Sequence, residues 1–251
     1  MKYILLGVIQ GLTEFLPVSS SGHLVLFQSI LKVPNSIAFD VIVHLATGLA
    51  VIVYFWKDII ELFTSKRKML WLIAVATVFT GILGLGFKDF FESLFSSVFA
   101  VGCFLILTGV IIMLAEWLGK GKRSLEEMNI WDAVFIGLAQ GCAIAPGLSR
   151  SGTTISASLG RGLNRTLAAR FSFLLSVPAI LGAGLVQSKA IVKAGTIGIG
   201  IWPLVLGFVA AFVSGWIAIK IFMSIIQRTS IRMFAYYCFV VGLIVLILSV
   251  F

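Results

Sequence analysis

The sequence predicts an all-α integral membrane protein with six transmembrane helices and two re-entrant helical hairpins in an inverted-topology repeat. Three observations support this prediction: the apolar composition, six long apolar segments, and a polar motif that occurs twice at interrupted helices. The chain has 251 residues, of which 60% are hydrophobic and 12% are charged, and its mean hydropathy is +1.12. A soluble domain is closer to half apolar and a quarter charged, so we expect the solvent around this chain to be lipid.

Six apolar segments are long enough to cross about 30 Å of hydrocarbon, which takes roughly 20 helical residues. They are residues 39–56, 70–88, 97–118, 165–187, 199–223 and 232–250.

Two further apolar regions are too short to cross and are interrupted by polar residues. They pair residues 2–16 with 22–33 and residues 131–145 with 152–161, with Pro17 and Pro146 at the two interruptions. Two half-length helices joined by a polar break predict a re-entrant hairpin. Such a break is tolerated at membrane depth only where protein or a wet cavity surrounds it.

The two interrupted regions are copies of each other. Adding 130 to a position in the first region gives an identical residue in the second at six places, which are Gly7/Gly137, Gln10/Gln140, Gly11/Gly141, Ser19/Ser149, Ser21/Ser151 and Gly22/Gly152. The chain is therefore predicted to contain two repeats, residues 1–119 and 120–251, each with one hairpin and three spans. Because three is odd, the second repeat enters the membrane from the opposite side, and the broken helices face each other near the midplane.

The formal charge of +9 would suggest a nucleic-acid partner in a soluble protein. Here the basic residues lie between apolar segments, so they are topology signals and no nucleic-acid partner is expected. One predicted side carries Lys57, Lys66, Arg67, Lys68, Lys120, Lys122, Arg123, Arg161, Arg165, Arg228 and Arg232, and the other carries Lys2, Lys32, Lys88, Lys189 and Lys193. The eleven basic residues on the first side, against five on the second, predict that the first side is cytoplasmic and that both termini face outward.

Gln10 and Glu14 lie four residues apart on the first half-helix and therefore share a face. An ionisable residue inside the membrane is costly and usually functional. Glu14 is a candidate metal ligand together with Gln10, a candidate general base, or a structural ion-pair partner of Arg150. Gln10 and its copy Gln140 are also compatible with simple hydrogen bonds between helices.

Three consecutive serines, Ser19, Ser20 and Ser21, precede the second half-helix. Free backbone N–H groups and the helix dipole bind anions at such a position. N-capping alone would need one serine, so three favour an additional role. Ser20 is the most distinctive because the equivalent position 150 is arginine, and its hydroxyl could act as a nucleophile beside a base.

The chain has two histidines, and they are expected to differ in role. His23 follows the serines and is a candidate base, acid or covalent acceptor. His44 lies inside the first predicted span, and a structural role is expected for it.

Arg150 in the second polar break is the strongest single signal. An arginine at the membrane centre costs at least ~2.5 kcal/mol, and its planar fork suits phosphate oxygens. The expected substrate-binding residues around it are Ser19, Ser21, Gly22, Ser149, Ser151, Thr153 and Thr154. A carboxylate beside such an anion site requires either a bridging cation or a role as base, and a diphosphate with Mg²⁺ or Ca²⁺ satisfies both demands.

Both motifs resemble those of undecaprenyl-diphosphate phosphatases, also called bacitracin-resistance proteins. Residues 10–23, QGLTEFLPVSSSGH, resemble the family's [E/Q]xxxE-to-SGH block, and residues 146–154, PGLSRSGTT, resemble its PGxSRSxxT block. The resemblance extends over the whole chain. By matching positions, it implies that Glu14, Ser20, His23 and Arg150 form the catalytic core.

The resemblance also implies an activity and a location. It implies a bacterial plasma-membrane enzyme that converts undecaprenyl diphosphate to undecaprenyl phosphate and inorganic phosphate, which recycles the lipid carrier for peptidoglycan. A divalent cation, a site open to the outer face and bacitracin resistance on overproduction are implied as well. We expect Ser20 to attack the terminal phosphorus and His23 to take its proton; His23 or water as nucleophile are the alternatives.

Two other functions remain as alternatives on the sequence. A secondary transporter or lipid flippase fits inverted repeats with broken helices at the midplane. An anion channel needs neither a carboxylate nor a histidine beside the arginine, so Glu14 and His23 argue against it. The oligomeric state is left open, with a homodimer among the alternatives, and the expected partners are the lipid substrate and the membrane.

Overall fold

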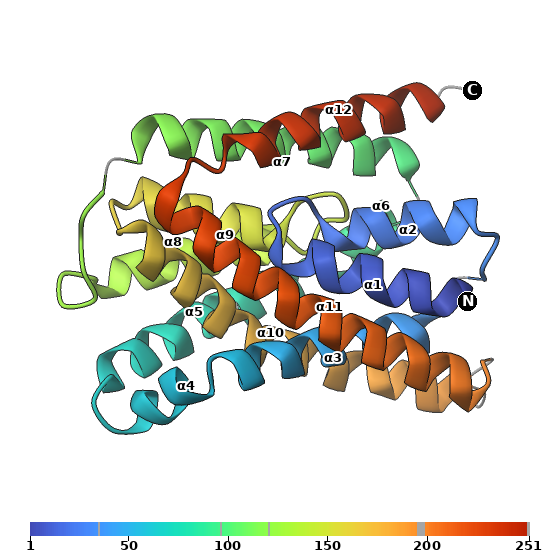
Figure 1. The fold of residues 1–251 in the computed structure, drawn as a ribbon, viewed down its shortest axis with the longest axis horizontal. Helices are drawn as coiled ribbons and strands as arrows, with labels where there is room; N and C mark the ends of the chain where they lie inside the picture. Colours follow the sequence, from blue (N-terminus) through green and yellow to red (C-terminus); the bar gives the residue numbers. More distant parts are fainter. Residues whose placement is uncertain (35, 96, 120, 195–198, 250–251) are drawn as a thin grey trace.

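The computed structural model describes residues 1–34, 36–95, 97–119, 121–194 and 199–249, and for residues 188–194 the backbone alone. Among the topology signals, Lys120 and the side chains of Lys189 and Lys193 therefore lie outside the described part. Within that part the secondary structure is helical, without strands (Figure 1). The helices are α1 (Lys2–Phe15), α2 (Ser20–Ile30), α3 (Ile37–Tyr54), α4 (Trp56–Phe63), α5 (Arg67–Gly86), α6 (Lys88–Leu94), α7 (Val98–Leu118), α8 (Ile130–Cys142), α9 (Arg150–Gly160), α10 (Arg165–Ala194), α11 (Ile201–Arg228) and α12 (Arg232–Leu248).

Each of the six predicted spans falls on a helix, but one of these helices is short. Five described helices, α3, α5, α7, α10 and α11, are long and apolar enough to cross a membrane, which makes this a multi-pass membrane protein. Helix α12 has 17 residues, fewer than the predicted span 232–250. Helices α10 and α11 run beyond the predicted ends at 187 and 223, and the short helices α4 and α6 are not predicted from the sequence.

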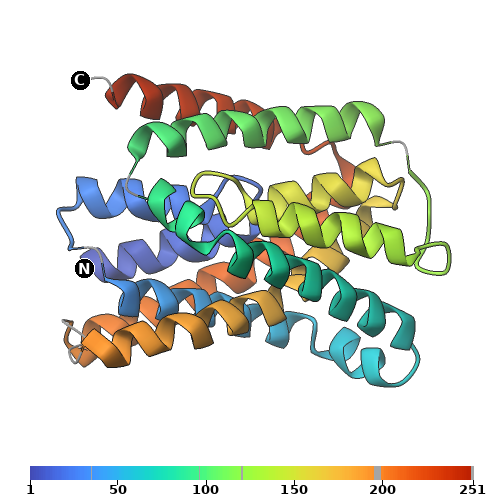
Figure 2. The ribbon, with the colours of Figure 1, turned by 180° about the vertical axis from the view of Figure 1, so that it is seen from behind.

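The four half-length helices occupy the middle of the molecule. In Figure 1 the pair α1 and α2 fills one half of this middle layer and the pair α8 and α9 fills the other. Helices α7 and α12 pack together along one side of it, and α3 and α10 pack together along the other. Helix α11 crosses one face against α1, and α5 crosses the opposite face against α8 (Figure 2).

Local sequence signals explain where the half-length helices begin and end. Helix α1 ends at Phe15, two residues before Pro17, because the residue before a proline avoids helical geometry. Helix α8 begins with a capping box, in which Asn129 and Asp132 satisfy each other's backbone N–H groups. Serine side chains at Ser19 and Ser149 accept hydrogen bonds at the starts of α2 and α9.

An apolar cluster joins the middle layer to the long helices. Phe15 of α1 packs edge-on against Phe173 of α10, with ring centroids 5.5 Å apart, and Phe173 in turn packs against Phe222 of α11 at 5.7 Å. All three side chains are fully buried. Because Glu14 is adjacent to Phe15, this packing fixes the depth at which the carboxylate lies.

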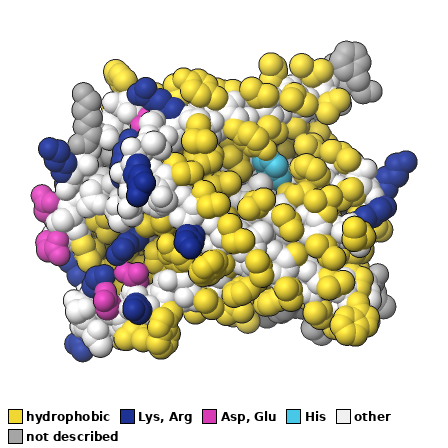
Figure 3. All heavy atoms as spheres, in the orientation of Figure 1, with side chains coloured by type: hydrophobic (Ala, Val, Ile, Leu, Met, Phe, Trp, Pro, Cys, Tyr) yellow, Lys and Arg dark blue, Asp and Glu magenta, His cyan; other side chains and the backbone are white. Residues whose placement is uncertain are grey.

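Charged side chains and exposed tryptophans mark one end of the molecule. Lysine and arginine side chains gather at the end where α4 and α5 meet, and an apolar band covers the middle (Figures 1 and 3). Trp71, Trp117 and Trp131 lie near this charged end of their helices and expose more than half of their surface. Exposed tryptophans next to a charged end are typical of the membrane–water interface.

A buried ion-pair network holds the charged end together. Asp132 is completely buried and accepts from both terminal nitrogens of Arg123, at 3.1 and 2.7 Å, and from Nε of Arg161 at 2.7 Å. Arg123 also pairs through its backbone with Gly162 and Asn164. The network therefore ties the segment before α8 to the end of α9.

We predict that Asp132→Ala lowers the stability by about 2–3 kcal/mol. The substitution removes the acceptor shared by two arginines and one half of the capping box, although both arginines keep some contact with solvent. Thermal or SDS-induced unfolding of the purified protein measures the change. Asp89→Ala on the exposed face of α6 is the matched control and should unfold like the wild type; equal behaviour of the two variants would contradict the prediction.

Candidate functional site

The polar breaks of the two hairpins meet in the middle of the molecule. The Oγ of Ser151, at the start of α9, donates to the carbonyl of Leu16 at 3.0 Å. Gly152 favours this approach, because a Cβ atom there would lie 3.2 Å from the Cβ atom of Pro17, which is tighter than an ordinary contact. Two regions that are about 130 residues apart in sequence thus form one site.

The carboxylate of Glu14 is the centre of this site. Its Oε1 accepts from Nη2 of Arg150 at 2.5 Å, and its Oε2 accepts from Oγ of Ser20 at 2.5 Å and from Nε2 of Gln10 at 2.8 Å. Gln10 and Glu14 are buried, whereas Ser20 and Arg150 keep part of their surface exposed. The structure brings together three of the four predicted catalytic residues, with Gln10, the residue predicted to share a cation with Glu14, beside them.

The remaining serines lie at the starts of the two inner helices. Ser19 accepts from the backbone N–H of Gly22 at 3.4 Å, and Ser149 accepts from that of Gly152 at 3.1 Å. Ser19 has a φ of 69°, which is strained for a residue with a side chain. Such strain is concentrated at functional sites, where the surrounding structure enforces it.

Two buried donors of the site have no partner among the described residues. They are Nη1 of Arg150 and Oγ1 of Thr153, which lies one turn into α9. By contrast, Thr154 is engaged internally, with the carbonyl of Arg150 at 2.8 Å and the hydroxyl of Ser172 at 2.6 Å. Because a buried donor without a partner is costly, the unpaired atoms of Arg150 and Thr153 indicate that an acceptor from outside the chain, such as a phosphate oxygen, binds here.

The structure pairs His23 differently from the sequence expectation. Its Nδ1 lies 2.7 Å from the carbonyl of Ser19, and its Nε2 lies 2.7 Å from the hydroxyl of Tyr237 on α12. Both ring nitrogens are thus engaged, while Ser20 donates to Glu14 instead. In place of the expected Ser20–His23 pair, the structure therefore shows a Ser20–Glu14 pair and a His23–Tyr237 pair.

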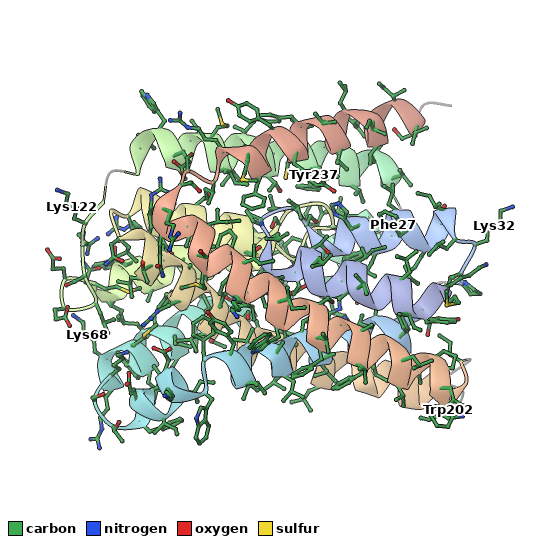
Figure 4. The ribbon with its side chains drawn as sticks, in the orientation of Figure 1. Phe27, Lys32, Lys68, Lys122, Trp202 and Tyr237 are labelled. Atoms are coloured by element: carbon green, nitrogen blue, oxygen red, sulfur yellow. The ribbon has the colours of Figure 1, made fainter. Side chains whose placement is uncertain are left out.

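Two further residues of the site are missed by the sequence analysis. His44, for which a structural role is expected, has its Nε2 3.7 Å from Oε2 of Glu14. The rule that polar groups inside a span are usually functional could have indicated it. Tyr237 (Figure 4) stacks on His23 with ring centroids 5.7 Å apart, and an aromatic residue in an apolar segment gives no comparable signal.

The donor set fits a divalent cation when water or substrate oxygens complete the coordination. Among the described residues, no cluster of three or more His, Cys, Asp or Glu side chains is placed to hold a metal ion. However, Oε1 of Gln10 is buried without a partner next to the Glu14 carboxylate. One carboxylate and one amide oxygen are sufficient where substrate phosphates and water supply the other ligands, as is usual for Mg²⁺.

A model of a known family matches this chain. The model described as "Bacitracin resistance protein BacA" matches residues 3–244, which is nearly the whole sequence and includes both hairpins. The chain belongs to this family. The resemblance of the two motifs is therefore confirmed at the level of the family.

Relatives in the family share the length as well as the sequence. A protein of Halothermothrix orenii is 46% identical over 99% of this chain and 97% of its own length, and one of Carboxydothermus hydrogenoformans is 47% identical over 98% and 96%. A protein of Methanosphaera stadtmanae is 40% identical over 100% of this chain and 98% of its own length. All three are named undecaprenyl-diphosphatase.

Close packing of α1 on α11 holds Glu14 in place, and we predict that Gly11→Ala disrupts it. A methyl group at Gly11 would collide with Ser214 and with the backbone of α11, whereas one at Gly81 on α5 would meet open space. We expect Gly11→Ala to destabilise the protein by about 1–3 kcal/mol and to lower activity by displacing Gln10 and Glu14.

Gly81→Ala is the matched control and should leave both properties unchanged. Thermal unfolding and activity assays of the two purified variants test the prediction. Native stability and activity in Gly11→Ala would show that the α1–α11 contact does not position the site.

Proposed function

We propose that this protein is an undecaprenyl-diphosphatase, which hydrolyses undecaprenyl diphosphate to undecaprenyl phosphate and inorganic phosphate. The observation that carries the proposal is the Glu14 carboxylate, which binds the hydroxyl of Ser20 on one oxygen and the guanidinium of Arg150 on the other. The proposed nucleophile, base and cationic phosphate ligand are thus joined by hydrogen bonds. Membership of the family and the printed names of its members agree with this activity.

The substrate's diphosphate would bind between the starts of α2 and α9. Backbone N–H groups and helix dipoles at two helix starts attract an anion. The unpaired Nη1 of Arg150 and Oγ1 of Thr153 would donate to phosphate oxygens. Ser19, Ser21, Gly22, Ser149 and Ser151 would form the rest of the pocket, and Thr154 would support it through Arg150 and Ser172.

The proposed reaction has two steps. Oγ of Ser20 attacks the terminal phosphorus while Glu14 takes the hydroxyl proton, the phosphoanhydride bond breaks, and undecaprenyl phosphate leaves. Water then attacks the phosphoserine, the bond between Oγ of Ser20 and phosphorus breaks, Glu14 returns its proton to Oγ, and inorganic phosphate leaves as H₂PO₄⁻ with both protons of the water. Arg150 would stabilise the charge on the transferred phosphoryl group. His23, held by Tyr237, would orient the Ser19 carbonyl and the serine loop; His23 or water as nucleophile remain the alternatives.

A divalent cation, Mg²⁺ or Ca²⁺, is proposed to complete the site. Glu14 and the unpartnered Oε1 of Gln10 would hold it together with substrate oxygens. When bound, such a cation neutralises phosphate charge and polarises the phosphoryl oxygens.

The proposed architecture is six spans and two re-entrant hairpins in two inverted repeats, residues 1–119 and 120–251. Contacts that recur at an offset of about 130 residues support it. A side chain at Gly7 would meet Gly207, and one at Gly137 would meet Ala76. Likewise, Cys238 donates to the Pro17 carbonyl and Thr108 donates to that of Gly147. Helix α12, at roughly 26 Å, is slightly short for the hydrocarbon layer, and a local thinning of the bilayer would accommodate it.

We propose a bacterial plasma-membrane location, with the charged end in the cytoplasm and the site open to the outer face. Figure 4 shows Lys68 and Lys122 at the charged end and Lys32 at the opposite end, as the predicted sides require. Helix α1 begins and helix α12 ends at the less charged end (Figure 1), which agrees with outward-facing termini. The proposed partners are the polyprenyl diphosphate and membrane lipids, and a homodimer remains one alternative for the assembly.

Flipping of the lipid headgroup is the main rival to hydrolysis. Phosphate release from a polyprenyl diphosphate in detergent separates the two, because no membrane is present across which a lipid could move. Release by the wild type that is lost in Glu14→Gln supports the phosphatase. Movement of the lipid in vesicles without any release of phosphate would support the rival.

We predict that alanine substitutions of three site residues lower activity by different amounts. Ser20→Ala should lower kcat by at least about 1,000-fold, because the attacking atom is removed. Arg150→Ala should lower it by at least about 100-fold through the loss of charge stabilisation. Ser21→Ala, which removes one hydroxyl, should cost less than about tenfold. Phosphate release by the purified variants tests this order, and near-native turnover in Arg150→Ala would refute the role of the guanidinium.

Removal of divalent cations is predicted to lower phosphate release by at least about tenfold. The protein would be treated with EDTA, dialysed and assayed, and Mg²⁺ or Ca²⁺ would then be added back. Restoration by either ion is the expected result. Full activity in the persistent presence of EDTA would contradict the proposed cation.

A further inference from the structure

His44 of α3 faces the centre of the site although neither sequence motif includes it. Its Nε2 lies 3.7 Å from Oε2 of Glu14, the same oxygen that Ser20 and Gln10 contact. One third of the His44 side chain is exposed, so it lies where the buried carboxylate meets the accessible part of the site. The proposed reaction assigns it no role.

A hydrogen bond fixes the tautomer of the neutral His44 ring. Nδ1 lies 2.7 Å from the backbone carbonyl of Asp40, one turn earlier on α3. A carbonyl can only accept, so Nδ1 carries the hydrogen and the neutral ring presents a lone pair at Nε2. Histidines that bind metal ions are commonly oriented in this way, with the second nitrogen donating to a backbone carbonyl or carboxylate.

The lone pair of His44 and the carboxylate of Glu14 therefore face each other as two electron donors. Two ligands that are each about 2.1 Å from one ion lie roughly 3.0 Å apart at a right angle and roughly 3.4 Å apart at the tetrahedral angle. The observed 3.7 Å is within a few tenths of an ångström of that range. A third donor, the buried and unpartnered Oε1 of Gln10, belongs to the amide that contacts the same carboxylate oxygen.

We propose that His44 is a ligand of the divalent cation at Glu14 and Gln10. The inference rests on the proposed function, in which a cation binds at this carboxylate. An imidazole nitrogen is a good ligand for Co²⁺ and Zn²⁺ and a poor one for Ca²⁺, which takes oxygen ligands. His44 therefore adds affinity for cations that accept nitrogen, whereas Mg²⁺ and Ca²⁺ are held by the oxygen ligands.

The competing explanation is a protonated His44 that forms an ion pair with Glu14. Arg150 already supplies one positive charge to that carboxylate. The two explanations differ in what the removal of the imidazole does to metal binding. Loss of a ligand weakens the binding of Co²⁺, whereas loss of a competing positive charge leaves it equal or stronger.

The full-length protein, purified in detergent and stripped of metal, is titrated with Co²⁺ alone and with Ca²⁺ alone. Calorimetry gives the affinities, and the visible absorption of bound Co²⁺ reports nitrogen ligation. His44→Gln is compared with His23→Gln, the matched control. His23 is the chain's other histidine, and both of its ring nitrogens are engaged by Ser19 and Tyr237. Unfolding of each variant without metal verifies the fold.

The wild type and His23→Gln should bind Co²⁺ at least about tenfold more tightly than His44→Gln does, with little change for Ca²⁺. The Co²⁺ absorption bands should shift in His44→Gln alone. Unchanged Co²⁺ affinity in His44→Gln, an equal loss in His23→Gln, or Co²⁺ binding that survives Glu14→Gln would overturn the proposal. Phosphate release by the wild type with Mg²⁺ or Ca²⁺ tests the proposed function separately, so the two can fail independently.

Discussion

The ion pair between Glu14 and Arg150 is the constraint on which the rest of the structure depends. Each of these charges would be expensive alone inside a membrane, and each comes from a different hairpin. Their contact is therefore possible only if both polar breaks reach the same depth and lie side by side. The carboxylate accepts from the guanidinium on one oxygen and from the hydroxyl of Ser20 on the other, and Nη1 of Arg150 has no partner among the described residues.

Meeting this constraint requires the helix backbones to pack closely. Lipid tails are as apolar as the side chains, so helices associate through backbone approach and hydrogen bonds rather than through the hydrophobic effect. Gly7 and Gly11 provide that approach for α1 on α11, and Gly137 and Gly141 provide it for α8 on α5. At the charged end, Asp132 anchors the second hairpin through two arginines. These residues around the site therefore serve to hold Glu14 and Arg150 in place and take no part in the proposed reaction.

Local sequence signals predicted much of this arrangement, and long-range geometry accounts for what they missed. The prolines and serine caps located the half-length helices within a few residues, because these effects act over one turn. The Glu14–Arg150 ion pair was one of three alternatives that the sequence left open for Glu14, and the structure shows the contact. By contrast, the partner of Ser20 depends on side-chain directions around one helical start, and the approach of His44 depends on how α3 packs against α1. The short helix α4 follows α3 after a break at Phe55, and the length of the apolar segment does not indicate this break.

Residues that the two proposed repeats share position the helices, and residues that differ between the repeats carry the roles of the proposed reaction. The six identical pairs at an offset of 130 residues are glycines, glutamines and serines, and one of the serine pairs, Ser19 and Ser149, caps the starts of α2 and α9. At the same offset, the position equivalent to Glu14 is Ile144. The position equivalent to Ser20 is Arg150, and the one equivalent to His23 is Thr153. Two identical halves could hold an anion, but they could not distinguish the phosphorus that is attacked from the phosphate that leaves. The proposed base and nucleophile lie on one hairpin and the guanidinium lies on the other, which would provide that distinction. The residues that break the repeat are therefore those to which the proposed reaction assigns its roles.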